Sequence, residues 1–171
     1  MLQHRGQDAA GISVCNNDDQ LNSRKSMGYV RDVFQQRHME KLVGNYGIGH
    51  VRYPTAGGAG KEFAQPMYVN SPYGISLVHN GNLTNSKQLG NELFHAEMRD
   101  LQTDSDSEVL LNIFAHELGK QREIYPSEKH IFKAVAKTHI RCDGAYAVLA
   151  LINGHGMLAF RDSNGIRPLS I

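Results

Sequence analysis

Small and apolar residues alternate with polar ones near both ends of the chain, in the pattern of β-strands. Residues 8–15 alternate in this way, residues 16–19 have turn chemistry, and residues 20–27 can return as the second arm of an antiparallel hairpin. The Asn153-Gly154 pair predicts a second hairpin turn near the C-terminal end. The other expected strands are residues 47–53, 75–78, 145–152 and 157–160.

Between these strands, apolar residues recur at helical spacing. The Ser-Asp-Ser-Glu sequence at residues 105–108 is a capping box that predicts a helix extending to Gly119, and Pro126-Ser127 predicts the start of another. Shorter helices are expected at residues 32–42 and 84–98. The apolar stripe expected on the helix after Ser127 consists of Ile131, Phe132, Val135, Ala136 and Ile140.

The elements therefore come as strands, then helices, then strands, joined by hairpins rather than by βαβ crossovers. This order predicts an α+β fold in which antiparallel sheets pack on each other and helices cover the outer faces. With 171 residues, 40% of them hydrophobic, and no internal repeat or linker, the chain fits a single domain over residues 1–171.

Charge and cysteine content narrow the class of protein. Eighteen Lys and Arg against seventeen Asp and Glu give a formal net charge of +1, and no basic run marks a nucleic-acid surface. No apolar run approaches the ~18 residues that span a bilayer. Cys15 and Cys142 have neither zinc-site spacing nor a disulfide framework. We therefore expect a cytoplasmic protein with no nucleic-acid or membrane partner.

Two strand ends carry side chains suited to acyl transfer. Arg52 lies near the end of the strand at residues 47–53, where its guanidinium could hold a carboxylate through two parallel hydrogen bonds. Asn80 and Gly81 follow the apolar strand at residues 75–78 and present an amide side chain and a backbone N–H together. Such a pair of donors suits a developing oxyanion.

Other residues could carry chemistry, but structural roles are favoured for them. The glycine-rich residues 56–64 could cradle phosphate but lack the Lys-Ser/Thr pair that would follow, so a loop over a pocket is favoured. Cys142 beside Arg141 could have a lowered pKa, but no base accompanies it, and both cysteines are expected to be structural. The nine histidines show no metal-site spacing, and His50 and His79 are expected to support the pocket.

Six motifs, in register along the chain, resemble those of one enzyme family. Together they extend from Leu2 to Leu169 and resemble the glutaminase domain of amidophosphoribosyltransferases, although looser forms of two of them occur in other amidotransferases of the N-terminal-nucleophile class. The resemblance implies a four-layer α/β/β/α fold, that of glutamine amidotransferase type 2. The motifs read LQHRGQDAAGI, GIGHVRYPTAG, LVHNGNLTN, SDSEVLL, DGAYAV and RDSNGIRPL.

In this family an N-terminal cysteine attacks the side-chain amide of glutamine. The released ammonia passes to a phosphoribosyltransferase domain that makes 5-phosphoribosylamine for purine synthesis. The resemblance implies that Arg52 holds the α-carboxylate of glutamine and that Asp106 holds its α-ammonium group. It also implies that Asn80 and Gly81 form the oxyanion hole. The other positions that match residues lining the same pocket are Tyr53, Thr55 and Gly6.

The chain departs from the family pattern at both ends. Residues 1–6 read as the last turn of a helix with Gly6 as its left-handed terminal residue, and a lone turn is unstable. We therefore expect a partial domain that lacks about twenty residues, including the nucleophilic cysteine, as well as the phosphoribosyltransferase domain. The resemblance implies no cofactor in this domain, Mg²⁺ only with the phosphoribosyltransferase domain, and a homo-oligomer for the full-length enzyme.

Three functions remain open at this point. The first is the glutaminase part of an amidophosphoribosyltransferase, catalytically silent as an isolated chain. The second is a glutamine-binding module without catalysis. The third is the glutaminase domain of another amidotransferase, such as glucosamine 6-phosphate or asparagine synthetase, against which the RYPTAG and RDSNGIRPL motifs argue.

Overall fold

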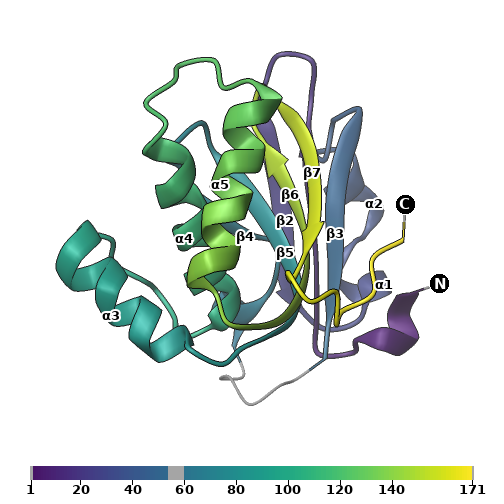
Figure 1. Cartoon of the computed structure of the whole chain (residues 1–171). Helices are drawn as coiled ribbons and strands as arrows, with labels where there is room; N and C mark the ends of the chain where they lie inside the picture. The colour runs from purple at the N-terminus through teal and green to yellow at the C-terminus, as the bar shows by residue number, and fades with distance from the viewer. Residues whose placement is uncertain (1, 54–59, 171) are drawn as a thin grey trace.

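Two antiparallel β-sheets pack against each other in the computed structural model of the chain, which describes residues 2–53 and 60–170 (Figure 1). One sheet has the strand order β2-β1-β3 and the other has the order β4-β5-β6-β7. In the first sheet the strands are β1 (Ala9–Cys15), β2 (Leu21–Met27) and β3 (Tyr46–Arg52). In the second they are β4 (Met67–Val69), β5 (Ile75–Leu83), β6 (Gly144–Ile152) and β7 (Gly156–Arg161).

The first sheet confirms the hairpin predicted from the N-terminal pattern. β1 pairs antiparallel with β2 on one side, from Ala9 opposite Met27 to Cys15 opposite Leu21. On its other side β1 pairs antiparallel with β3, which places Ala9 opposite Arg52. The short 3₁₀ helix η1 (Leu2–Arg5) precedes this sheet. The central strand β1 thereby fixes the position of the end of β3.

The helix expected at residues 32–42 is wrong in extent. The structure has two short helices, α1 (Val30–Val33) and α2 (Gln36–Met39), which are separated at Phe34 because this residue leaves the helical conformation with φ −111° and ψ 83°. Asp32 lies inside α1 instead of capping a helix, since the residue before α1 is Tyr29. α1 packs on β1 and β2, so these helices cover the first sheet.

The central strand of the second sheet, β5, is longer than the sequence predicted. The expected strand at residues 75–78 continues to Leu83, and it pairs with β6 over nine positions, from Ile75 opposite Ile152 to Leu83 opposite Gly144. Asn80 and Gly81 are therefore inside a strand and not beyond its end. The extension is stabilised because β6 offers main-chain partners along its whole length.

The helices α4 (Asp106–Gly119) and α5 (Glu128–Arg141) lie over the outer face of the second sheet, and α3 (Ser86–Glu97) packs against α4 (Figure 1). The residues predicted for the apolar face of α4, from Val109 to Leu118, are buried, and that helix is enclosed by sheet and helices. Ser105 caps α4 by accepting a hydrogen bond from the N–H of Ser107, while Glu108 binds the N–H groups of Gln102 and Thr103.

The stripe predicted for α5 is partly wrong. Ala134, Val135 and Thr138 are its buried residues, whereas Phe132 is 60% exposed and Ile140 is 73% exposed. The polar Thr138 can be buried because its hydroxyl donates to the carbonyl of Ala134 at 2.9 Å. This local bond removes the penalty that would otherwise exclude a hydroxyl from the core.

The contact between the sheets combines apolar packing with a buried hydroxyl chain. Cys15 and Ile48 of the first sheet pack with Val78 and Leu151 of the second. Next to them, the Ser76 hydroxyl donates to Ser13 at 2.8 Å, and that of Ser13 donates to Ser23 at 3.0 Å. Helices, sheet, sheet and short helices thus form successive layers, which confirms the α+β fold and its four-layer α/β/β/α arrangement.

Two further expectations concern the backbone conformation of Gly6 and membrane-spanning helices. Gly6 is not left-handed, which corrects that expectation; it is needed because a Cβ there would lie 2.5 Å from the carbonyl of Val51. None of the helices in the described part of the chain is long and apolar enough to cross a membrane.

Replacing Phe114 by alanine should destabilise the domain strongly. Phe114 is fully buried on α4 and packs against Phe160 with ring centroids 5.8 Å apart. Its removal leaves a cavity, so the free energy of unfolding should fall by about 3–5 kcal/mol in urea titrations. The matched control is Phe132→Ala, which should change this free energy by less than about 0.5 kcal/mol because Phe132 is on the surface. Equal losses would contradict the burial pattern.

Candidate active site

Arg52 occupies a buried position at the end of β3. It is only 6% exposed, and its Nη1 donates a hydrogen bond to Asp8 Oδ2 at 2.7 Å. The ring of Phe63 lies against the guanidinium, with Cζ 5.4 Å from the ring centroid. An unpaired charge is costly to bury, so Asp8 both stabilises Arg52 and fixes its orientation.

The neighbours of Arg52 include two of the other predicted site residues. Gly6 packs against the backbone of this strand end, where a Cβ would lie 2.7 Å from the carbonyl carbon of Arg52. Tyr53 follows directly and is 67% exposed. Thr55 lies outside the described residues, as do residues 56–59 of the glycine-rich loop that could cradle phosphate.

Asp106 lies beside β5 at the first turn of α4. Its Oδ2 accepts a hydrogen bond from the N–H of Leu83 at 3.0 Å, and its Oδ1 lies 3.7 Å from Nδ1 of His79. The start of a helix favours a carboxylate because the unsatisfied N–H groups there carry partial positive charge. The structure therefore brings Asp106 to the same strand segment as Asn80 and Gly81.

Gln65 holds the same segment from the side on which β4 begins. The side-chain Oε1 of Gln65 accepts from the N–H of His79 at 2.6 Å, and its Nε2 donates to the carbonyl of His79 at 3.2 Å. Met67 of β4 pairs with Leu77, so the same register places Gln65 opposite His79. A side-chain amide thus continues the ladder between β4 and β5 where the backbone of β4 no longer does.

These two side chains show the direction of the N–H groups of β5. The N–H groups of His79 and Leu83 both bind side chains, those of Gln65 and Asp106, on the side away from β6. Alternate N–H groups of a strand point the same way. From this alternation we infer that the N–H of Gly81 points to the same side. Gly81 has a φ of +154°, and a Cβ there would lie 2.0 Å from the carbonyl oxygen of Ala145, so only glycine fits.

Asn80 points to the opposite face of β5 from His79. Val78 packs between the two sheets, so Asn80, two residues further on, lies on the face of β5 turned toward the first sheet. His79 instead faces α4, where its Nδ1 lies 2.9 Å from the hydroxyl of Ser107. Asn80 is solvent-exposed, and its amide is therefore accessible to a ligand.

Both histidines expected to support the pocket have lowered pKa values. Burial, together with the charges of His79 and Arg52, lowers the pKa of His50 to about 4. Burial also lowers the pKa of His79, against the opposing effect of Asp106, and the charge of Arg167 lowers it further. Both imidazoles are therefore neutral near neutral pH and add no positive charge between Arg52 and Asp106.

The Arg167 loop is organised by one buried carboxylate. Asp162 accepts hydrogen bonds from the N–H groups of Tyr146, Ile166 and Arg167, at 3.3, 2.9 and 3.0 Å. These backbone donors lower the pKa of Asp162 and outweigh the opposing effect of burial. The RDSNGIRPL motif thus brings the charge of Arg167 close enough to His79 to affect its titration.

Sequence reasoning did not find Asp8 or Gln65. The sequence pattern places Asp8 only at the start of a strand. Its pairing with Arg52 arises from the β1–β3 register, which brings together residues 44 positions apart. Gln65 gave no signal in the pattern, although extending the β4–β5 register by two residues would have placed it opposite His79. The hydroxyl of Ser107, which binds both Gln65 and His79, was read only as part of a helix cap.

Both cysteines have structural surroundings. Cys15 is fully buried, and its Sγ lies 3.3 Å from Oδ1 of Asn153. Burial raises the pKa of Cys142 to about 12, despite the opposing charge of Arg141. Because the thiolate is the nucleophilic form, Cys142 is not suited to attack an amide, and the sulfur of Cys15 is enclosed by the core. This supports the structural reading of both residues.

The fold agrees with the comparison to known proteins. The profile of the glutamine amidotransferase domain family matches residues 58–171, and the chain belongs to this family. It is 61% identical over 169 residues to the amidophosphoribosyltransferase of Pseudomonas aeruginosa, and 59% identical over 170 residues to that of Escherichia coli. Each alignment covers 99% of this chain and 34% of the relative.

A solved structure of the same kind of enzyme is also similar. The glutamine phosphoribosylpyrophosphate amidotransferase from B. subtilis, complexed with ADP and GMP, superposes with a TM-score of 0.78 and 34% identity. The match covers 98% of this chain and 34% of that one. The chain thus spans about a third of the length of the relatives it matches.

Replacing Gln65 by methionine should destabilise the domain although the volume is nearly unchanged. The variant would leave the buried N–H and C=O of His79 without the partners that Gln65 supplies, so we expect a loss of about 3 kcal/mol in free energy of unfolding. Gln121→Met removes one hydrogen bond, from the side chain of Gln121 to the carbonyl of Glu117, just after α4. It should lower the free energy of unfolding by about 1 kcal/mol or less. If Gln65→Met lowered the free energy of unfolding no more than this control, the hydrogen bonds from Gln65 to His79 would not contribute to stability.

Acid should destabilise the folded chain through His50. Since the pKa of His50 is lowered from 6.5 to about 4, the unfolded chain binds a proton in this window that the folded chain does not. The free energy of unfolding should therefore fall as pH falls from about 6.5 to about 4, by about 3 kcal/mol from this group. Urea titrations across this range should give a shallower pH dependence for His50→Gln; an unchanged slope would contradict the assignment.

Proposed function

We propose that this chain is the glutamine-binding and ammonia-releasing part of an amidophosphoribosyltransferase. In the complete enzyme the ammonia would displace pyrophosphate from phosphoribosyl pyrophosphate, giving 5-phosphoribosylamine in purine synthesis. The identity of 61% and 59% to two enzymes of that name supports this proposal. So does an arrangement of side chains at the end of β3 and along β5 that suits an amino acid amide.

The proposal rests on the position of Gly81 in β5, midway between His79 and Leu83, whose N–H groups are both hydrogen-bonded to side chains. The N–H groups on either side already bind Gln65 and Asp106, so the strand is held in place before a ligand arrives. A substrate carbonyl placed at Gly81 would meet this N–H and the accessible amide of Asn80. Two donors fixed in this way stabilise the oxyanion of a tetrahedral intermediate, and losing one typically costs about 2.7–4 kcal/mol.

The remaining assignments use opposite charges to hold the two ends of a free amino acid. We assign Arg52, oriented by Asp8, to the α-carboxylate of glutamine and Asp106 to its α-ammonium group. Tyr53, Thr55 and Gly6 complete the proposed pocket. A guanidinium can bind a carboxylate with two parallel hydrogen bonds, which an ammonium group cannot do.

The attack on the amide requires a thiolate that Cys15 and Cys142 do not supply, because both are buried. We assign this step to the N-terminal cysteine implied by the family resemblance, and the acceptor chemistry with its Mg²⁺ to a phosphoribosyltransferase domain. The complete enzyme would then be a cytoplasmic homo-oligomer. This chain contributes the binding of glutamine and the stabilisation of the oxyanion.

A chimera tests both the glutaminase activity and the role of Arg52. Residues 2–170 would replace the matching segment of the Pseudomonas aeruginosa relative, and pyrophosphate release from phosphoribosyl pyrophosphate would be measured with glutamine or with ammonium as nitrogen donor. Arg52→Lys keeps the charge but loses the bidentate geometry. We expect kcat/KM for glutamine to fall about thirtyfold, equivalent to about 2 kcal/mol, with ammonium-dependent activity unchanged.

The control variant is Arg31→Lys, which changes an exposed arginine on α1 and should leave both activities unchanged. If Arg52→Lys lowered both activities equally, Arg52 would have a structural role only. If the parent chimera used ammonium but not glutamine, while calorimetry showed saturable glutamine binding, the chain would be a binding module. Absence of both glutamine use and glutamine binding would refute the proposal.

A further inference from the structure

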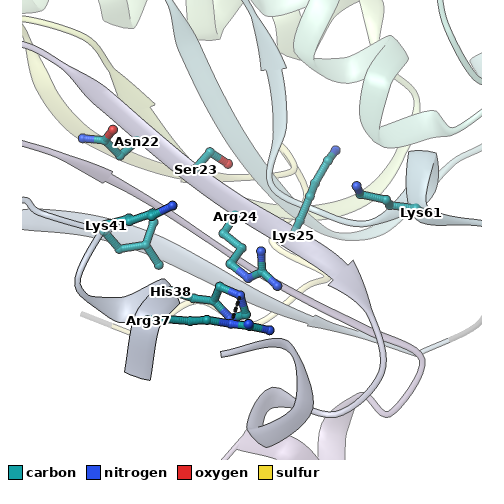
Figure 2. Close-up of a pocket in the computed structure, with 9 residues that line it drawn as sticks. Asn22, Ser23, Arg24, Lys25, Arg37, His38, Lys41 and Lys61 are labelled. Atoms are coloured by element: carbon teal, nitrogen blue, oxygen red, sulfur yellow. Dashed lines mark hydrogen bonds between the residues drawn. The ribbon is translucent and has the colours of Figure 1, made fainter. Parts of the chain in front are cut away.

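A groove of about 760 Å³ lies along the first sheet, and its described lining includes none of the residues assigned to glutamine. It is formed by β2, the α2 region and the short 3₁₀ helix η2 (Lys61–Phe63). Figure 2 shows these side chains gathered along β2, with Lys25 and Lys61 toward one end and the α2 residues near Arg24. Its described lining is Asn22, Ser23, Arg24, Lys25, Arg37, His38, Lys41, Leu42 and Lys61.

The charge of this groove differs sharply from that of the whole chain. Its described lining includes five lysines and arginines and no carboxylate, whereas the formal net charge of all 171 residues is +1. None of these five cations forms an ion pair with a described carboxylate; Arg24 donates to the carbonyl of Val33, and Lys25 lies 3.8 Å from the sulfur of Met67. Positive charge is therefore concentrated along the groove, and its described lining includes no carboxylate.

Titration of the surrounding groups agrees with this concentration of charge. Loss of water contact and the charges of Arg24 and Arg37 lower the pKa of His38. The Nδ1 of His38 accepts a hydrogen bond from the N–H of Gln35, and its Nε2 lies 3.3 Å from Nε of Arg37. Burial lowers the pKa of Lys25, which Glu108 opposes and Lys61 reinforces. The groove thus holds its cations at an energetic cost that a bound anion would offset.

The size and chemistry of the groove define its ligand class. Its volume is in the range of small-molecule sites, about 300–1,000 Å³. Arginine and lysine together are suited to phosphate oxygens, and one phosphate group could not neutralise five cations. We propose that this groove binds a small molecule carrying two or more linked phosphate groups, at a site separate from that of glutamine.

The proposal can be tested by calorimetric titration of the 171-residue chain with inorganic tripolyphosphate and with ADP. We expect saturable binding of both that weakens strongly between about 20 mM and about 150 mM NaCl, because opposite charges are screened. The variant Arg37→Gln/Lys41→Gln removes two exposed cations of the groove and should weaken binding about tenfold or more. Chemical-shift changes in NMR spectra should map to β2 and to residues 36–42.

The matched control is Lys133→Gln/Lys137→Gln, which removes two exposed cations from α5 and should leave binding within about twofold of the parent. Equal weakening by the two double variants would assign the effect to net charge and overturn the proposal. Failure of both phosphates to bind at low salt would also overturn it. So would binding of poly-glutamate in their place, which would indicate an acidic protein partner.

Discussion

The pairing of β5 with β6 is the constraint on which the remainder of the site depends. Because it runs without interruption from Ile75 to Leu83, it fixes which N–H groups face β6 and which face outward. A slip of one residue would turn every side chain of β5 to the other face and every outward N–H inward. Gly81 helps to set this register, since the close carbonyl of Ala145 leaves no room for any larger residue. The geometry proposed for the oxyanion is therefore a property of the sheet.

Charge is distributed in the site so that an amino acid zwitterion could meet opposite charges at two points. Arg52 is held by Asp8, and Asp106 is anchored to the backbone of β5. His50 and His79 are neutral at physiological pH, because burial lowers the pKa of both and outweighs the effect of Asp106 on His79. If His79 were charged, it would compete with a bound ammonium group for Asp106. Burial of these two rings thus preserves the contrast between the two charged ends.

Local sequence patterns predicted the elements whose stability is local, and the six motifs predicted the family. The β1–β2 hairpin and the buried face of α4 follow from alternation and helical spacing that need no distant partner. The length of β5 could not be predicted in this way, because it depends on a strand more than sixty residues away. The exposure of Phe132 depends on which face of α5 meets α4, and the roles of Asp8 and Gln65 depend on register between strands.

The side chain of Gln65 also has a consequence for how the molecule behaves among its neighbours in solution. β4 has only three residues, so beyond Met67 the backbone of β5 would present unpaired donors and acceptors at the margin of the sheet. Such exposed strand edges can recruit a strand from another molecule, which is a common route to aggregation. By occupying the main-chain groups of His79, Gln65 closes part of this edge with a group that cannot itself propagate a sheet.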